Sequence, residues 1–463
     1  MQAIAMNNSL DLTQQPIPYL LRKLATPVGT GFFFSTMFNA VDTYYGGRIS
    51  TKALAALSLS FPLFFVILAM ATGIAMATTA ITGHNLGAGN REEAELHAAQ
   101  ALSFALIHAL MLTAFGLVAA PTVFRLLGAE GDYLRHALDY MNVMFGGAVF
   151  FIGNHTLNAL LSATGDTRSF RNFLIAGFFF NLALDPVLIY GWFGLPPLGL
   201  AGIPAATVII HMFGSIYLFT RVAKSGLISR HSWHLLAPRR APYLKLLSQG
   251  FPASLNMLTV AIGIFIITWF IGDYGKEAVA AYGIGTRIEQ IVLLPVMGLN
   301  MATLTLVAQN SGAGKFSRVR HTVRTAFRAG LAMMALGTAL VFFAATPLMR
   351  LFTADPAVLA NGTVFLRIEA LTLGAYVVLY LNNSALQGLQ KPGFALLIGL
   401  FRQIAAPTLA FSFLAHRLKL GLPGIWWGIF LVTWIAAAIS IIYTRHVLSV
   451  LAQDPAPDLR EPA

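Results

Sequence analysis

The sequence predicts an all-α integral membrane protein with twelve transmembrane helices in two six-helix lobes, and two observations support this. Hydrophobic residues make up 57% of the 463 residues, charged residues only 10%, and the mean hydropathy is +0.71. Soluble domains contain roughly 45–50% apolar and about 25% charged residues. The apolar residues also recur in stretches of about 20 or more, the length a helix needs to cross a bilayer.

Twelve such stretches follow one another, separated by short polar turns or turns that contain Gly and Pro. We predict spans at residues 17–44, 52–82, 94–119, 133–162, 170–191, 200–222, 244–270, 279–309, 319–344, 357–386, 394–415 and 423–446.

The net charge of +12 reflects topology rather than nucleic-acid binding. With twelve spans, most Lys and Arg residues fall in the loops on one side, and few, such as Arg48 and Lys52, fall on the other. Cytoplasmic loops of membrane proteins carry this excess. We therefore expect a multi-pass protein of the cell membrane, in bacteria the inner membrane, with both termini in the cytoplasm.

The two halves of the chain are predicted to be a duplication. Residues 53–56 resemble 278–281, and 85–89 resemble 310–314, both at a shift of 225 positions without a gap. Because six spans separate equivalent positions, both halves enter the membrane in the same direction, as parallel repeats. We predict an N-terminal lobe at 1–222, a cytoplasmic linker at 223–243 and a C-terminal lobe with a short tail at 244–463.

Two six-helix lobes with a central cleft between them are typical of secondary transporters that work by alternating access. The sequence lacks the motifs that are typical of other classes of protein. No Cys occurs, and no Gly-x-x-x-x-Gly-Lys-Ser/Thr loop is present to bind ATP. We find no nucleophile with a base and no metal-ligand spacing, and expect neither an enzyme nor a cofactor or metal.

Acidic residues inside the predicted spans are the first candidates for function. Asp42 lies near the outer end of the first span, with no cation within helical reach on its inner side. An ionised carboxylate in hydrocarbon costs several kcal/mol, so such an acid is a functional candidate by default. Asn181 and Asp185 lie four apart and share one helix face. Pro186 lacks an N–H, which frees the carbonyl of Leu182 to accept another bond.

Several segments resemble the multidrug and toxic compound extrusion (MATE) family of transporters, from about residue 17 to 446. They resemble its first two helices and the following loop, and its fourth, fifth and sixth helices, at residues 42–48, 53–56, 86–94, 158–168, 181–186 and 198–207. The sodium-linked NorM-like branch would show acids in the seventh and tenth spans. Here the seventh span contains no acid, and Tyr376 lies in the tenth span about where that branch would have its acid. Acids at Asp42 and Asp185 are instead what the DinF-like branch would show.

This resemblance implies proton coupling through the N-terminal lobe, with sodium left open as the coupling ion. It implies a polar network in that lobe, in which protonation alters the shape of the first helix. The implied members are Pro27, Asp42, Tyr140, Asn158, Asn181, Asp185 and Thr207. The shift of 225 takes Asp42 to Ile267 and Asp185 to Ala410, so we expect one-sided coupling.

Other charged residues within spans are expected to form structural ion pairs, because a paired charge costs less in a membrane than a lone one. They are Arg287, Glu289, Arg367, Glu369 and Arg402. Glu289 is the alternative candidate for a substrate contact.

The predicted function is export of amphipathic, cationic organic compounds or drugs in exchange for protons. Carboxylates and aromatic faces both attract organic cations. Two alternatives stay open, a sodium-coupled antiporter and a flippase-like carrier of a lipid-linked substrate. We expect a monomer in the lipid bilayer whose partner is a small-molecule substrate.

Overall fold

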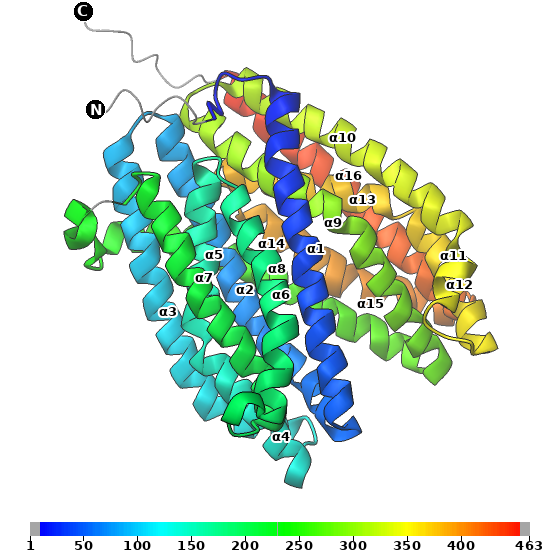
Figure 1. Ribbon diagram of the computed structural model, residues 1–463. Coiled ribbons are helices and arrows are strands. Elements are labelled where there is room, and N and C mark those ends of the chain that lie inside the picture. Colours follow the sequence, from blue (N-terminus) through cyan, green and yellow to red (C-terminus); the bar gives the residue numbers. More distant parts are fainter. Residues whose placement is uncertain (1–9, 229, 454–463) are drawn as a thin grey trace, which may run out of the picture. The chain divides into compact units, whose positions relative to one another are not determined.

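The computed structural model describes residues 10–228 and 230–453, and within these ranges it contains helices and turns but no strand (Figure 1). The first half contains α1 (Ile17–Ile49), α2 (Thr51–Gly87), α3 (Arg91–Leu126), α4 (Gly131–Gly146), α5 (Ala148–Ala163), α6 (Arg168–Tyr190) and α7 (Gly202–Lys224). The short helix η3 (Arg230–Leu236) lies in the linker. The second half contains α8 (Arg240–Gly272), α9 (Lys276–Gly312), α10 (Phe316–Phe343), α11 (Ala345–Arg350), α12 (Pro356–Ala370), α13 (Leu373–Gly388), α14 (Gly393–Leu400), α15 (Ala406–Phe411) and α16 (Leu422–Gln453).

Each predicted span is helical, although not every span is one straight helix. In the described part of the chain, nine helices are long and apolar enough to cross a membrane. Two further spans are bent pairs, α4 with α5 at 45° and α12 with α13 at 50°. Helix α1 has 33 residues, which at about 1.5 Å per residue also exceeds the hydrocarbon thickness. The chain is therefore an all-helical, multi-pass membrane protein.

The internal repeat is visible in the helix boundaries. Helix α2 runs from Thr51 to Gly87 and α9 from Lys276 to Gly312, so both ends differ by the predicted 225 positions. Helices α3 and α10 begin 225 positions apart, and so do α6 and α14. Helices α5 and α13 end 225 positions apart. Even the break after Gly146 in the first bent pair corresponds to the break after Ala370 in the second, to within a residue.

The described residues pack into two compact units. One unit is Thr30–Ser254, and the other combines Leu255 onward with the chain up to Gly29. The predicted lobes follow the sequence repeat, whereas these units follow packing. Residues before Gly29 join the second unit because Asn310, Lys315 and Arg318 donate hydrogen bonds to backbone carbonyls of residues 12–15.

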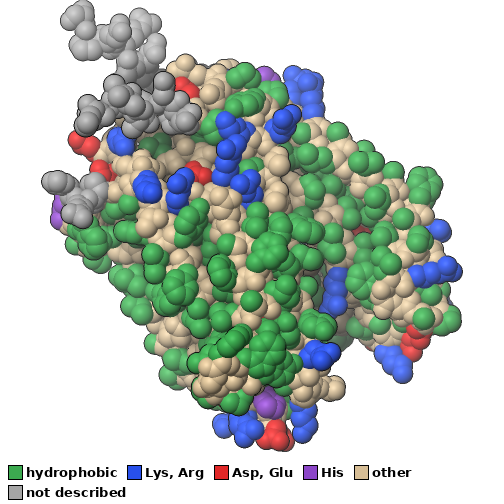
Figure 2. Space-filling view, viewed as in Figure 1, with side chains coloured by type: hydrophobic (Ala, Val, Ile, Leu, Met, Phe, Trp, Pro, Cys, Tyr) green, Lys and Arg blue, Asp and Glu red, His purple; other side chains and the backbone are tan. Residues whose placement is uncertain are grey.

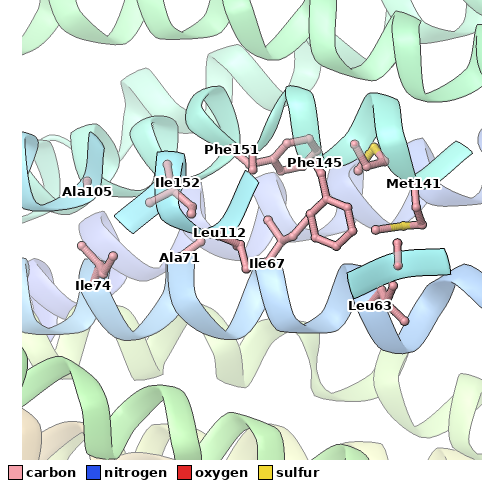
Figure 3. Close-up of a cluster of buried hydrophobic side chains, with 14 of the residues drawn as sticks. Leu63, Ile67, Ala71, Ile74, Ala105, Leu112, Met141, Phe145, Phe151 and Ile152 are labelled. Atoms are coloured by element: carbon pink, nitrogen blue, oxygen red, sulfur yellow. The ribbon is translucent and has the colours of Figure 1, made fainter. Parts of the chain in front are cut away.

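The core of the Thr30–Ser254 unit lies between α2, α3, α4 and α5 (Figure 3). Ile67 and Ile74 of α2 point toward Leu112 of α3 and toward Phe145 and Ile152, which flank the α4–α5 break. Small residues allow close packing, and Gly116 is one example, because a Cβ there would collide with the ring of Phe145. This packing fixes α4, which borders the candidate site.

On the face shown in Figure 2, hydrophobic side chains cover the flanks of the helices and Lys and Arg gather toward their ends. Large apolar side chains are exposed in both units, for example Phe115, Phe180 and Phe265. In a water-soluble protein such patches would be unusual. In a membrane protein they are the surface that faces lipid.

Candidate functional site

Two carboxylates and one amide meet inside the Thr30–Ser254 unit. The side-chain nitrogen of Asn181 donates to Oδ1 of Asp42 at 3.0 Å and to Oδ1 of Asp185, also at 3.0 Å. Asn181 and Asp185 are fully buried, and Asp42 is 9% exposed. The two acids are 143 positions apart in the sequence, yet they lie within two hydrogen-bond lengths of each other.

Local sequence explains how α6 presents its two site residues. Asn181 and Asp185 are four positions apart, so both face α1, as the spacing predicts. Pro186 lies inside α6 and cannot donate to Leu182, and the hydroxyl of Tyr45 on α1 donates to that freed carbonyl at 3.4 Å. The prediction that this carbonyl is free to accept another bond is confirmed, and the partner is a side chain. Tyr45 and Asp42 thus connect the same stretch of α1 to α6.

Helices α4 and α7 complete the surroundings of the acid pair. The Thr207 hydroxyl of α7 lies within hydrogen-bonding range of Asp42, and Tyr140 of α4 lies near both carboxyl groups. Gly202 allows α7 to approach α6 closely, since a Cβ there would lie 2.8 Å from the backbone nitrogen of Ile189. Four helices therefore hold this site.

The electrostatics of the pair favour binding of one positive charge. Among the described residues, no ion pair involves Asp42 or Asp185. Oδ2 of Asp185 and Oδ1 of Asn181 are buried and have no hydrogen-bond partner in the described chain. Two adjacent carboxylates repel each other, and a proton held by the pair removes one charge and supplies a donor for a free oxygen.

The structure does not bring every predicted site residue to this pair. Pro27 is buried in the part of α1 that packs with the other unit. Asn158 accepts a bond from Ser162, one turn further along α5, at 3.4 Å, and has no contact with either acid among the described hydrogen bonds. Asp42, Asp185 and Asn181 thus form the centre, with Thr207 and Tyr140 beside it.

A second acidic group lies in the Leu255–453 part of the chain. Glu289 of α9 and Glu369 of α12 both lie near the Tyr376 hydroxyl and near Arg402. The Arg402 guanidinium lies over the Tyr376 ring, 5.4 Å from its centre. Arg402 belongs to a turn of π-helix, Phe401–Ala405, and such turns are frequent at functional sites. A tyrosine and an arginine therefore lie near two carboxyl groups in this unit.

The predicted structural ion pairs, within one helix or across the lobe, are not among the ion pairs of the described residues, although Arg402 lies near Glu289 and Glu369. None of the ion pairs between described residues includes Arg287, Glu289, Arg367 or Glu369. Residues two apart point to nearly opposite sides of a helix. Accordingly, Arg367 is exposed whereas Glu369 is 2% exposed. The grouping of Glu369 with Tyr376 was not predicted from the sequence. Their spacing of seven positions on the tenth span could have indicated that they share a face.

No group of three or more His, Cys, Asp or Glu residues in the described chain is arranged to hold a metal ion. The candidate sites are thus pairs of carboxylates in a polar surrounding.

Comparison with known proteins places this arrangement in a family. The MatE family model matches residues 27–187 and again residues 252–411, so it matches both halves of the repeat. The chain belongs to the MatE family. It is accordingly a membrane transporter, as the resemblance to MATE proteins implied, and the DinF-like branch stays a prediction.

Similar proteins of this family are described as transporting different substrates. A protein of Shewanella oneidensis described as a FAD transporter is 30% identical over 402 residues, covering 86% of this chain and 88% of the relative. A probable multidrug resistance protein NorM of Thermotoga maritima is 26% identical, with 90% of each chain covered. The multidrug export protein MepA of Staphylococcus saprophyticus is 25% identical, covering 90% of this chain and 92% of the relative.

Solved structures support the same fold. A MOP superfamily transporter from Pyrococcus furiosus superposes with a TM-score of 0.90, 23% identity and coverage of 96% of this chain and 99% of that one. A MATE structure described as the bent conformation gives a TM-score of 0.89, at 24% identity and coverage of 96% and 98%. At this identity the likeness concerns the fold alone.

Proposed function

We propose that this protein is a secondary active exporter of amphipathic organic compounds that exchanges them for protons at Asp42 and Asp185. The observation that carries the proposal is that one buried amide binds two carboxylates, neither of which is paired with a cation of the described chain. Such a site binds a positive charge reversibly, because occupancy relieves repulsion within the pair. An antiporter needs this property at the point where its coupling ion binds.

The exchange follows from competition for the same negative charge. With the site open to the outside, a proton binds the acid pair, and a cationic substrate held by the carboxylates loses its attraction and leaves. With the site open to the cytoplasm, the proton leaves and the ionised pair attracts the next substrate. Asn181 stays bonded to both acids and keeps them on one side of α6. Proton binding would change the position of α1 relative to α6, because Asp42 and Tyr45 connect these helices.

An organic cation is the first substrate class to test, since multidrug export is what several relatives are named for. A flavin-type dinucleotide is a second candidate, because the relative that is 30% identical is described as a FAD transporter. Arg402 beside the Tyr376 ring is consistent with a planar molecule that carries negative charge. Competition between ethidium and FAD for transport would separate the two classes.

Sodium coupling through Glu289 and Glu369 is the alternative that one specific observation favours. These carboxylates flank Tyr376 in the second unit, so the acid pair of the first unit is not unique in the described chain. If this pair binds the coupling ion, transport should follow a sodium gradient and should depend on Glu369.

The test is transport in proteoliposomes that contain the purified protein, with either a proton gradient or a sodium gradient imposed. Asp42→Asn keeps the shape of the side chain but cannot lose a proton, so it should insert normally and fail to transport against a gradient. Asp185→Asn should act in the same direction. Asp139→Asn is the matched control, because Asp139 is exposed on α4. Full proton-driven transport by Asp42→Asn would refute the proposal, and sodium-driven transport that requires Glu369 would support the alternative.

A further inference from the structure

An apolar groove lies where the linker meets α3 and α7, apart from both acid pairs. It has a volume of about 410 Å³. Its walls include Leu102, Leu106 and Ile107 of α3, Phe219 of α7, and Trp233 and Leu236 of the linker. All of these residues belong to the Thr30–Ser254 unit.

Specific hydrogen bonds build the linker wall of this groove. The buried amide of Gln100 on α3 donates to the carbonyls of Leu235 and Ala237, the latter at 2.7 Å. Its oxygen accepts the backbone N–H of Arg239 at 2.9 Å. Tyr243 donates to Ser103 at 3.0 Å, and Ser232 donates to Glu95. The linker helix η3 is therefore fixed against α3 (Figure 1).

The groove lies at the boundary between polar and apolar parts of both helices. On α3, the residues from Arg91 to Gln100 are rich in charged and polar side chains, and the apolar run begins at Ala101. On α7, Phe219 is the last large apolar residue before Arg221 and Lys224. Trp233 is 63% exposed, and tryptophan is enriched at membrane–water interfaces. The groove thus lies level with the interface between lipid headgroups and hydrocarbon.

Basic residues follow the lining residues of the groove in the sequence: Lys224 lies five positions after Phe219, and Arg239 and Arg240 directly follow Pro238. Lys224, Arg239 and Arg240 are exposed, and no ion pair of theirs occurs among the described residues. Arg221 is paired with Asp166 at 3.5 Å, and Glu95 accepts the Ser232 hydroxyl. Together these residues carry a net positive charge. Clusters of Lys and Arg beside membrane helices attract anionic lipids.

We propose that this groove binds an anionic phospholipid, with an acyl chain along Leu106 and Trp233 and the phosphate-bearing headgroup toward Lys224, Arg239 and Arg240. The apolar lining matches a hydrocarbon chain, and the adjacent basic residues match a negative headgroup. A lipid held here bridges α3, α7 and the linker and so stabilises the docked position of the linker.

Brominated lipids provide the test, because bromine on an acyl chain quenches tryptophan fluorescence on contact. The full-length protein is reconstituted into equal mixtures of phosphatidylglycerol and phosphatidylcholine, with bromine on one lipid or the other. The difference between the wild type and Trp233→Phe isolates the signal of Trp233. We expect brominated phosphatidylglycerol to quench that signal with an apparent affinity about fivefold or more above that of phosphatidylcholine, which is about the effect of one engaged basic residue.

Two further variants separate the headgroup from the chain. Lys224→Gln combined with Arg239→Gln and Arg240→Gln should abolish the preference for phosphatidylglycerol and leave quenching by either lipid. Leu106→Phe should narrow the groove and reduce quenching by both lipids. Equal quenching by the two lipids in the wild type would overturn the proposal, as would no quenching of Trp233. Displacement of the brominated lipid by micromolar ethidium would also overturn it, in favour of a substrate site.

Discussion

The Asn181 amide gives the most direct quantitative test of the acid pair. It donates to both carboxylates at 3.0 Å inside a fully buried site. A hydrogen bond to a charged group contributes about 1.5–3 kcal/mol, and these bonds favour the ionised acids over the protonated ones. Asn181→Ala removes at least one such bond from whichever acid is ionised during the cycle. Because about 1.4 kcal/mol corresponds to one pH unit, the pH dependence of substrate binding should move upward by about one to two units.

The measurement is the substrate dissociation constant of the purified protein between pH 5 and pH 9, together with proton-driven efflux. Asn383→Ala is the matched control, since Asn383 is an amide within a span of the other unit, on α13, and has no described hydrogen bond to an acid. Thermal unfolding of each variant shows whether a loss of transport is only a loss of stability. An unchanged pH midpoint in Asn181→Ala, or an equal shift in Asn383→Ala, would refute the role assigned to this amide.

Three further outcomes are expected. Glu369→Gln should leave proton-driven export intact if coupling is confined to Asp42 and Asp185, and loss of proton-driven export with normal insertion would show that both units couple. A cysteine replacing Ser50 should react with an impermeant thiol reagent outside intact cells, whereas one replacing Ser225 should react only after permeabilisation, and the reverse pattern would invert the topology. The linker residue Ser229 lies outside the described residues. Gly298→Ala should lower the unfolding temperature, since the new Cβ would collide with the carbonyl of Ala25 and overpacking costs about 1–3 kcal/mol. Gly153→Ala, in open space within α5, should be neutral or stabilising. Equal melting temperatures of the two variants would contradict this packing.

Much of the fold could be predicted because its signals are local. An apolar stretch of about 20 residues in a bilayer must satisfy its own backbone, and a helix does this within one segment. The repeat then predicted corresponding helices, and α2 and α9 agree at both ends. The bends after Gly146 and Ala370 were not predicted, because the surrounding residues remain apolar and no proline marks either break.

The site was predictable where its geometry is local. Asn181, Asp185 and Pro186 lie within two turns of one helix, so their shared face and the freed carbonyl of Leu182 follow from spacing. The partner acid Asp42 is 139 positions from Asn181, and its place beside α6 depended on the family resemblance. Pro27 was assigned by the same route, yet its packing lies with the other unit, since helix α1 belongs to both.

The two acid groups show why a repeated fold does not imply a repeated site. A shift of 225 takes Asp42 to Ile267 and Asp185 to Ala410, and in reverse takes Glu369 to Met144 and Glu289 to Phe64. Each of these four acids therefore corresponds to an apolar residue in the other half, although helices around them, such as α2 and α9, begin and end at equivalent positions. Helix boundaries persist through duplication because packing constrains many residues together, whereas a single carboxylate can be gained or lost wherever a polar neighbour satisfies it. Since the two pairs share no positions, each can be neutralised without altering the other, and their contributions to coupling can be measured separately.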